Sequence, residues 1–371
     1  MANEKKTVRE PSFILALVPI VAMIGFMLYC FHGHSETGYH DAHLPLVMSI
    51  IVACIVGFIC GHSFQEMLAG MVERLAASME AVLILATVGF LVTSFMLSGA
   101  IPTMIVYGLD LLTPKLFLPV GCILCAIVGM ACGSSWTTTA TIGLAFLGIG
   151  AGLGIPAPIT AGMIISGAYV GDKFSPLSDT TNLAAAVAET GLFDHVTAMV
   201  STTGPTLLLS LILYTILGLN VDTSAYDATV AEGIQEAFRG AFTISPILLL
   251  PIIVVIVMCI LRVPGLVGIA VSVATAVVFM LIFQSTDIYY SRSLGDIFDV
   301  LHYGNAVETG NAVADSILGK AKGMDGMMWT INLILVALAY GGALERCGCI
   351  EKLFGGLKHK IHSVGSLILA T

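Results

Sequence analysis

The sequence predicts an all-α polytopic membrane protein with broken helices and hairpins, and three observations support this fold class. Of the 371 residues, 57% are hydrophobic and 11% are charged, whereas soluble domains carry roughly 25% charged residues. The mean hydropathy is +0.98. No Asp, Glu, Lys or Arg occurs in residues 116–171, 196–221 or 263–286. A charge at the centre of a bilayer is costly unless it lines a cavity or finds a partner, so a membrane explains these gaps.

Apolar windows of about 20 residues, the length that crosses a bilayer, recur along the chain. The first follows Lys5, Lys6 and Arg9 without an evident cleavage site, so we expect a retained span and not a secretory signal. A last apolar run begins near Val364 and stops at Thr371, so we expect the sequence to be a fragment of a longer protein. In all we predict nine spans, at residues 13–31, 44–60, 81–98, 116–132, 155–170, 197–219, 242–261, 266–283 and 327–344.

The distribution of Lys and Arg among short loops predicts the orientation. The basic residues before the first window place the N-terminus in the cytoplasm, and residues 345–360 are expected on the same side. The loop of residues 32–43 and the acidic loop of residues 222–236 are then outside. Four histidines in the first external loop could sense pH or bind metal, but their irregular spacing favours a plain polar loop: His32, His34, His40 and His43.

The composition excludes several kinds of partner. The net charge is −9, but the acidic residues cluster in a few loops and two intramembrane motifs, so no nucleic-acid partner is predicted. Most of the nine cysteines lie in apolar segments, where they behave as small hydrophobic residues, so no disulfide framework is predicted. No Walker A pattern is present, so no nucleotide is expected. The partners that remain are the lipid bilayer and transported solutes.

A loose internal repeat predicts the organisation of the chain. Residues 64–101 and 297–350 each have an amphipathic lead-in, an acidic start and a long span. Loop charges make the two copies enter their spans from opposite sides, which is the inverted-repeat architecture of secondary transporters, although two unrelated membrane helices could produce the same match. We expect an N-terminal two-helix segment at 1–62, a first repeat at 63–220, connecting transmembrane helices at 221–292 and a truncated second repeat at 293–371.

A cluster of hydroxyl side chains at residues 134–141 is the first candidate site. Six of these eight residues are Ser or Thr, and a glycine-rich apolar run follows. Glycine tolerates irregular backbone, and an unwound helix exposes carbonyl groups that bind cations. The alternative is packing through small residues, with the hydroxyls bonded back to their own helix. We favour packing for the glycines and a solute pathway for the hydroxyls.

The second candidate is the polar stretch 171–182, which lies between two apolar runs. Pro176 cannot continue a helix, whereas Ser178 and Asp179 make a good helix start, so we expect a break between two half-helices. Protons and Na+ could compete for one partly desolvated carboxylate, and exchange follows from that competition. The alternative is an ordinary exposed turn. The oxygen ligands that a hard cation needs would come from Asp172, Ser175, Ser178, Asp179, Thr180 and Asn182.

Two further places carry weaker signals. Glu308, Asn311 and Asp315 lie in the lead-in to the second repeat, where solvated side chains are the simpler interpretation. Asn332 lies within a predicted span and could equally face the solute pathway or bond to a neighbouring helix.

Three segments carry a family resemblance: GSSWTTTATIGLAFLGIGAGLG, ITAGMIISGAYVGDKFSPLSDTTNLAA and GMMWTINLILVALAYGGALE. They resemble the corresponding segments of the NhaC family of Na+/H+ antiporters, and the resemblance covers most of the chain from about Glu66 onward. It implies a secondary antiporter of the bacterial inner membrane that exchanges Na+ for H+. Some relatives couple this exchange to organic acids such as malate and lactate.

The resemblance also implies roles by position. Asp172, Ser178, Asp179, Thr180 and Asn182 match the ion-site motif, with Na+ held at Asp172 and Asp179. Lys173 would pair with a carboxylate and release it as pH changes. The family's second repeat continues with a polar broken segment of its own, which this sequence does not reach, so part of the site would be absent. The preceding hydroxyl motif matches Ser135, Thr137 and Thr138.

The expected activity is therefore Na+/H+ exchange by alternating access, without a cofactor or an enzymatic reaction. The nearest alternative is a sodium-coupled organic-acid exchanger, for which Lys173 is the only charged candidate near the motif. A protease using Asp172 and Asp179 as a dyad, and a channel, are alternatives from other classes. Ion stoichiometry and the formation of a homodimer are left open by the sequence.

Overall fold

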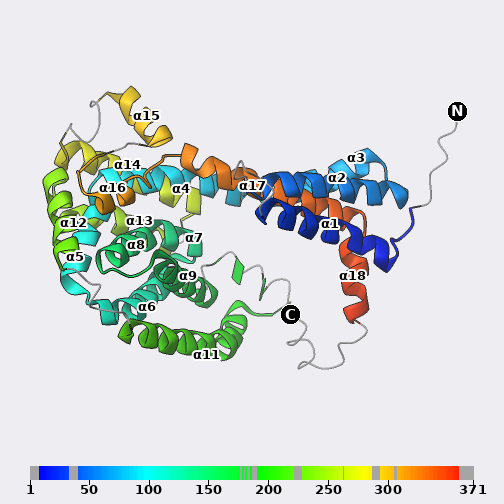
Figure 1. Cartoon of the computed structure of the whole chain (residues 1–371), viewed down its shortest axis with the longest axis horizontal. Coiled ribbons are helices and arrows are strands. Elements are labelled where there is room, and N and C mark those ends of the chain that lie inside the picture. Colours follow the sequence, from blue (N-terminus) through cyan, green and yellow to red (C-terminus); the bar gives the residue numbers. More distant parts are fainter. Residues whose placement is uncertain are drawn as a thin grey trace. The chain divides into compact units, whose positions relative to one another are not determined.

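The computed structural model describes residues 8–32, 41–175, 178, 180–181, 184–185, 190–220, 228–261, 263–285, 293–304 and 307–358. Every regular element in these ranges is a helix and no strand occurs among them, which confirms the predicted all-α class (Figure 1). Each of the nine predicted windows coincides with a helical segment.

Several helices are long and apolar enough to cross a membrane. Among the described residues, four meet this test alone: Phe13–Phe31, Leu192–Leu219, Leu266–Phe283 and Asp325–Arg346. The number rises to six when each of two bent helix pairs counts as one span, and one such pair, Thr229–Ala241 with Pro246–Met258, is bent by 90°. Together with the composition, these helices identify a multi-pass membrane protein.

The helices divide into two compact units, Met1–Leu83 with Met328–Thr371, and Ile84–Met327. The four segments expected from the repeat, with boundaries at residues 62, 220 and 292, stay a prediction. The boundary between the units falls within α4 (Met79–Leu97) and α17 (Asp325–Arg346). The other helices of the first unit are α1 (Phe13–Phe31), α2 (His43–Ile59), α3 (Phe64–Ala77) and α18 (Cys349–Lys358).

The first unit is held together by small side chains that let its helices approach closely. A Cβ atom on Gly57 would lie 2.6 Å from the sulfur of Met67, and one on Gly342 would lie 2.6 Å from the carbonyl oxygen of Gly70. The buried hydroxyl of Tyr340 donates to the carbonyl of Pro19 at 3.0 Å. Small residues at helix interfaces are typical of membrane bundles, where dispersion forces favour close backbones.

The second unit contains the remaining helices. Its core gathers fully buried aromatic and aliphatic side chains such as Phe95, Ile101, Ile105 and Phe117. The elements are α5 (Ala100–Leu111), α6 (Pro114–Cys132), α7 (Ser135–Thr138), the π-helix η1 (Thr139–Gly143), α8 (Leu144–Gly152), α9 (Ala157–Phe174), α11 (Leu192–Leu219), α12 (Ala228–Ala241), the 3-10 helix η2 (Pro246–Leu249), α13 (Leu250–Ile260), α14 (Gly265–Phe283), α15 (Leu294–Tyr303) and α16 (Ala312–Leu318).

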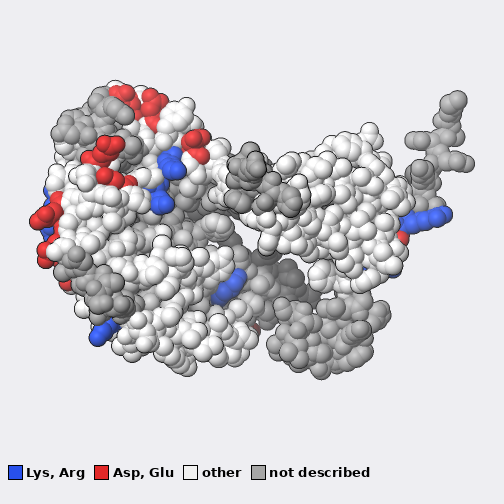
Figure 2. Space-filling view, in the orientation of Figure 1, with Lys and Arg blue, Asp and Glu red and all other residues white. Residues whose placement is uncertain are grey.

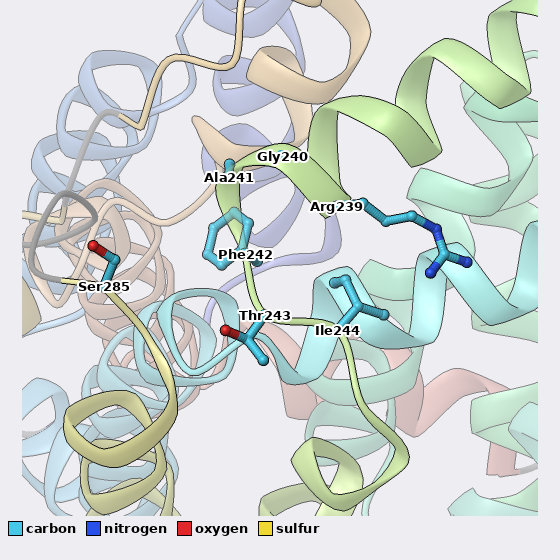
Figure 3. Close-up of a pocket in the computed structure, with 7 residues that line it drawn as sticks. All are labelled: Arg239, Gly240, Ala241, Phe242, Thr243, Ile244 and Ser285. Atoms are coloured by element: carbon cyan, nitrogen blue, oxygen red, sulfur yellow. The ribbon is translucent and has the colours of Figure 1, made fainter.

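A buried glutamine ties three parts of the second unit together beside the elbow between α12 and η2. Gln284 accepts a hydrogen bond from the Thr243 amide at 3.0 Å and donates to the Ser98 carbonyl at 2.9 Å. Next to it is a cavity of about 450 Å³, lined by residues 239–244 and Ser285 (Figure 3). Of the described residues that line this cavity, Arg239 is the one that is charged, and it is paired with Asp110 at 3.7 Å. These lining residues therefore offer no unpaired charge to a solute.

The charged residues are few and unevenly placed on the surface. Figure 2 shows a face on which uncharged side chains predominate, with acidic side chains gathered on parts of the second unit. The acidic residues of α12 and α15 include Glu232, Glu236, Asp296 and Asp299. A largely uncharged surface is the surface expected for a protein that is solvated by lipid.

Candidate functional site

The two candidate motifs lie at the ends of α6 and α9, which are parallel neighbours. A Cβ atom on Gly167 would lie 2.3 Å from the Cys122 carbonyl oxygen, and one on Gly171 would lie 2.2 Å from the Ala126 carbonyl oxygen. Both contacts advance by four residues on both helices, so the helices run in the same direction. The end of α6 at Cys132 and the end of α9 at Phe174 therefore lie at the same level of the unit.

The break after α6 is built by a glycine and a serine. Gly133 ends α6 with φ +63°, a left-handed conformation that costs a side-chain-bearing residue energy. Ser134 then caps α7, because its hydroxyl accepts from the Thr137 amide at 3.2 Å. The segment continues as the π-helix η1, and such π-bulges are frequent at functional sites. The backbone is thus irregular at the hydroxyl cluster itself, whereas the glycine-rich run that follows forms the regular helix α8.

The hydroxyls of this segment are largely bonded within it. Thr138, Thr139 and Thr141 donate to the carbonyl groups of Ser134, Ser135 and Thr137 at 2.9, 2.8 and 2.7 Å. Their donor capacity is thus used locally, as the packing alternative expects, while each oxygen keeps acceptor lone pairs. Ser135, Thr137 and Thr138 are buried. Within the described part of the chain, no hydrogen bond joins them to Asp172.

The glycines that follow lie at close contacts between helices, in agreement with the packing interpretation that we favoured for them. A Cβ atom on Gly148 would lie 2.5 Å from Ile105, and one on Gly150 would lie 2.5 Å from the hydroxyl of Thr160. One on Gly143 would lie 2.7 Å from Ile164. These contacts place α8 and η1 against α5 and α9 and leave no room for a larger side chain.

Asp172 is the buried carboxylate of the candidate site. It lies in the last turn of α9 and is 5% exposed. The hydroxyl of Thr180, eight residues further along the chain, donates to Asp172 Oδ2 at 3.3 Å. Lys173 Nζ in turn donates to Thr180 Oγ1 at 3.2 Å, which connects the ammonium to the carboxylate through one hydroxyl. The exposed-turn alternative does not describe Asp172, although Thr180 itself is exposed.

Further hydroxyls surround this pair. Ser175 and Ser178 are fully buried, and Ser178 Oγ lies 3.0 Å from Thr180 Oγ1. Thr181, which the sequence did not single out, is also buried and donates to the Asp172 carbonyl at 3.2 Å. Its hydroxyl side chain and its position inside the predicted stretch 171–182 were the signals that could have identified it. Asp179 and Asn182, both predicted site residues, lie outside the described residues.

Two of the weaker candidates, Asn311 and Asp315, have structural roles. Asn311 caps α16 by accepting from the amides of Val313 and Ala314 at 3.0 and 3.1 Å. Asp315 accepts from the amide and the hydroxyl of Thr309, both at 2.7 Å. These bonds fix the turn before α16 and do not point to a solute site. Glu308 and Asn332 are exposed.

The chain matches the model of the Na+/H+ antiporter family over residues 167–371, which include the whole 171–182 motif. This match covers more than half of the 371 residues. The chain belongs to the Na+/H+ antiporter family. This match and the similarity to NhaC antiporters reported below confirm the resemblance that the three sequence segments indicated.

Curated relatives of this family member are antiporters with different named cargoes. An arginine/ornithine antiporter, ArcD, of Halobacterium salinarum is 35% identical over 98% of this chain and 73% of the relative. A Na+/H+ antiporter, NhaC, of Alkalihalophilus pseudofirmus is 34% identical over 89% of this chain and 70% of the relative. A malate-2H+/Na+-lactate antiporter of Bacillus subtilis is 31% identical over 99% and 76%. No solved structure matches this family member significantly.

Proposed function

We propose that this member of the Na+/H+ antiporter family exchanges Na+ for H+ across the membrane, with both ions competing for Asp172 and Asp179. The observation that carries the proposal is a buried carboxylate at a helix break, surrounded by hydroxyl oxygens and joined to a single lysine. A buried carboxylate needs a counter-charge, which a proton or a hard cation supplies. Only one of the two ions neutralises it at a time, and that exclusion couples their fluxes.

The residues around Asp172 divide this task. The Asp172 carboxylate would hold the proton or provide the charged ligand for Na+, and Ser178 and Thr180 would add neutral oxygens. Lys173 reaches Thr180 and not Asp172 directly, so it lowers the cost of the ionised carboxylate without occupying its oxygens. The oxygens of Ser135, Thr137 and Thr138, at the neighbouring break, would complete the pathway. Alternating access would come from the two inverted repeats.

An organic cargo is the second candidate, because two of the relatives named above carry organic solutes. An organic acid would require a cation that is free to meet its carboxylate. Lys173 is the cation nearest to the motif, and it is engaged by Thr180 in this structure. This engagement favours inorganic ions over an organic acid.

The proposal includes the membrane in which the protein lies and its orientation there. We place it in the bacterial inner membrane with the N-terminus in the cytoplasm, because basic residues precede α1. Transport would be driven by ion gradients alone, without a cofactor or a chemical reaction. A homodimer is compatible with this mechanism but is not required by it.

The test is Na+-dependent proton flux in proteoliposomes of the full-length protein, with malate, lactate and amino acids absent. Wild type should exchange, and Asp172→Asn and Asp179→Asn should fall to the level of empty vesicles. Asp194→Asn is the matched control, because Asp194 is an exposed aspartate of α11 whose loss should leave the flux unchanged. Exchange that persists in Asp172→Asn, or wild type that stays silent until an organic solute is added, would contradict the proposal.

A further inference from the structure

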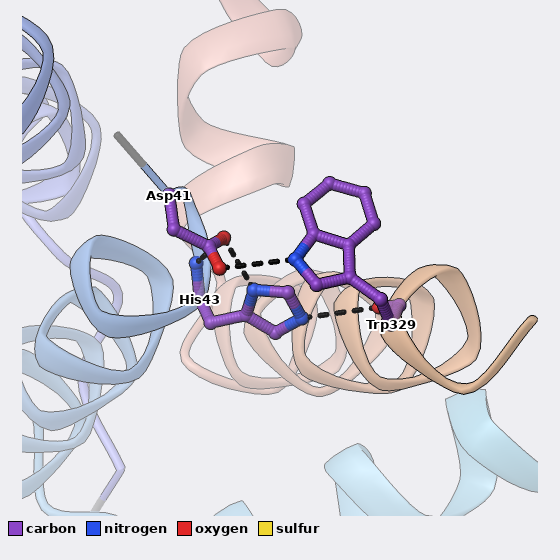
Figure 4. A network of polar contacts seen from close by, with 3 residues as sticks. All are labelled: Asp41, His43 and Trp329. Atoms are coloured by element: carbon purple, nitrogen blue, oxygen red, sulfur yellow. Dashed lines mark hydrogen bonds and ion pairs between the residues drawn. The ribbon is translucent and has the colours of Figure 1, made fainter. Parts of the chain in front are cut away.

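A network of three side chains joins the start of α2 to α17 within the first unit. Asp41 precedes α2, His43 is its first residue, and Trp329 lies in the second turn of α17, 286 positions after His43 (Figure 4). The indole Nε1–H of Trp329 donates to Asp41 Oδ2 at 3.1 Å. The imidazole of His43 meets Asp41 Oδ1 through Nδ1 and the Trp329 carbonyl oxygen through Nε2, the latter at 3.2 Å.

Both ring nitrogens of His43 therefore face oxygen atoms that can only accept a hydrogen bond. A neutral imidazole carries one N–H and would place a lone pair against the second acceptor, whereas an imidazolium carries two N–H groups and satisfies both. The Asp41 carboxylate adds an attractive charge at the same place. The ring of Trp329 also packs edge-on against His43, with ring centroids 5.2 Å apart.

We infer that Asp41, His43 and Trp329 form a proton-operated latch, which closes between α2 and α17 when His43 is protonated and loosens when it is neutral. Histidine is the side chain most often used as a proton switch near neutral pH, and here both of its ring nitrogens face acceptors. The latch involves none of the residues assigned to the ion site.

The charged and titratable groups around His43 agree with this assignment. α2 carries no other charged residue, His32 follows α1, and Asp325 lies one turn before Trp329 on α17. Burial opposes the ionisation of Asp41, but hydrogen bonds from His43 and Trp329 outweigh it and lower the pKa of the Asp41 carboxyl. A lowered pKa keeps Asp41 ionised as pH falls, so its charge stays available to an imidazolium at His43 until Asp41 itself is protonated.

Trp329 provides a direct probe of the latch. The sequence has two tryptophans, Trp136 and Trp329, so Trp136→Phe leaves the latch residue as the one fluorophore of this kind in the chain. An imidazolium quenches an adjacent indole more strongly than a neutral imidazole does. The emission of Trp329 should therefore fall on acidification, in one transition.

Three variants decide the origin of that transition. His43→Gln should abolish it, and Asp41→Asn should move it to lower pH, because the imidazolium loses its counter-charge. His62→Gln is the matched control, since His62 lies just after α2, beside Glu66, and should leave the transition in place. Emission that does not depend on pH, or a transition that persists in His43→Gln, would overturn the latch.

The effect of the latch on transport rests on the proposed function and is measured separately. A closed latch restrains α17, so His43→Gln should exchange faster than wild type at pH 6 and equally at pH 8. Equal rates at both pH values would overturn the regulatory role. A wild type without any Na+/H+ exchange would reject the proposed function instead, while the fluorescence result would stand.

Discussion

Thr180 is the residue through which the candidate ion site is organised. Its hydroxyl accepts a hydrogen bond from Lys173 and donates one to Asp172. The ammonium and the carboxylate are therefore connected through the Thr180 oxygen. The motif predicted that these residues belong to one site, but not this order of contacts. The order depends on where Thr180 lies relative to the end of α9, which no local sequence pattern specifies.

Removing that hydroxyl should weaken Na+ binding more than it weakens folding. Thr180→Val keeps the shape of the side chain but lets Lys173 approach Asp172 directly and removes an oxygen ligand. A hydrogen bond to a charged group contributes about 1.5 kcal/mol, so the half-saturating Na+ concentration should rise about tenfold. Thr180→Ser should restore wild-type behaviour. Thr197→Val, which removes an exposed hydroxyl of α11, is the matched control, and an unchanged Na+ dependence in Thr180→Val would remove Thr180 from the site.

Asp315, beside α16, is a carboxylate with a structural role. Hydrogen bonds from the backbone and side chain of Thr309 lower the pKa of the Asp315 carboxyl. A lowered pKa means that its contribution to stability is present above the ordinary aspartate range and is lost as pH falls through the lowered value. Asp315→Asn should therefore lower the unfolding temperature at pH 7 and approach wild type in acid.

Glu308→Gln serves as the control for Asp315, because Glu308 is an exposed carboxylate of the same segment. Thermal unfolding in detergent at pH 7 and in acid compares the three proteins. A loss of transport in Asp315→Asn without any loss of stability would contradict the structural role.

At the scale of elements, the sequence predicted helices and breaks better than it predicted their contacts. All nine apolar windows are helical, because about 20 apolar residues in a lipid environment satisfy their backbone in no other local way. No sequence pattern predicted the π-helix at Thr139–Gly143. The parallel contact of α6 with α9 was also unpredicted, since it depends on glycines whose partners lie some 45 residues earlier in the chain.

That contact makes Gly171 sensitive to any side chain. A Cβ atom there would lie 2.2 Å from the carbonyl oxygen of Ala126 and 2.7 Å from the amide nitrogen of Met130, both of them backbone atoms that cannot move away cheaply. Gly171→Ala should cost about 1 to 3 kcal/mol of stability, the usual cost of overpacking. Gly162→Ala on the same helix meets only the hydroxyl of Tyr214 at 3.4 Å and is the matched control. Equal thermal stability of the two variants would contradict the close approach of α6 and α9.

At the scale of the whole molecule, composition and charge gaps were enough to predict a multi-pass membrane protein, and family membership confirmed the transporter class. The latch of Asp41, His43 and Trp329 was not predicted. The histidines of that loop were interpreted as plain polar residues, because nothing in the sequence connects His43 with a tryptophan 286 positions away. Polar contacts between residues so far apart in the chain have no local sequence pattern, so only the three-dimensional structure identifies them.

The proposed orientation is open to a direct test by labelling. In a cysteine-free background, a membrane-impermeant maleimide should label Ser35→Cys from outside intact cells and Asn3→Cys only after permeabilisation. Basic residues near the N-terminus set this direction. Labelling of Asn3→Cys in intact cells would invert the assignment.

The central claim is that Na+ and H+ compete for the same carboxylates, and the pH dependence of Na+ affinity tests it most directly. The half-saturating Na+ concentration for exchange should be measured in proteoliposomes of the full-length protein at several pH values, with the pH equal on both sides at the start. Competition for one proton predicts a rise of roughly tenfold for each pH unit on the acid side, with an unchanged maximal rate. A half-saturating concentration that stays constant while the maximal rate falls would show that the proton acts elsewhere, and would contradict the account.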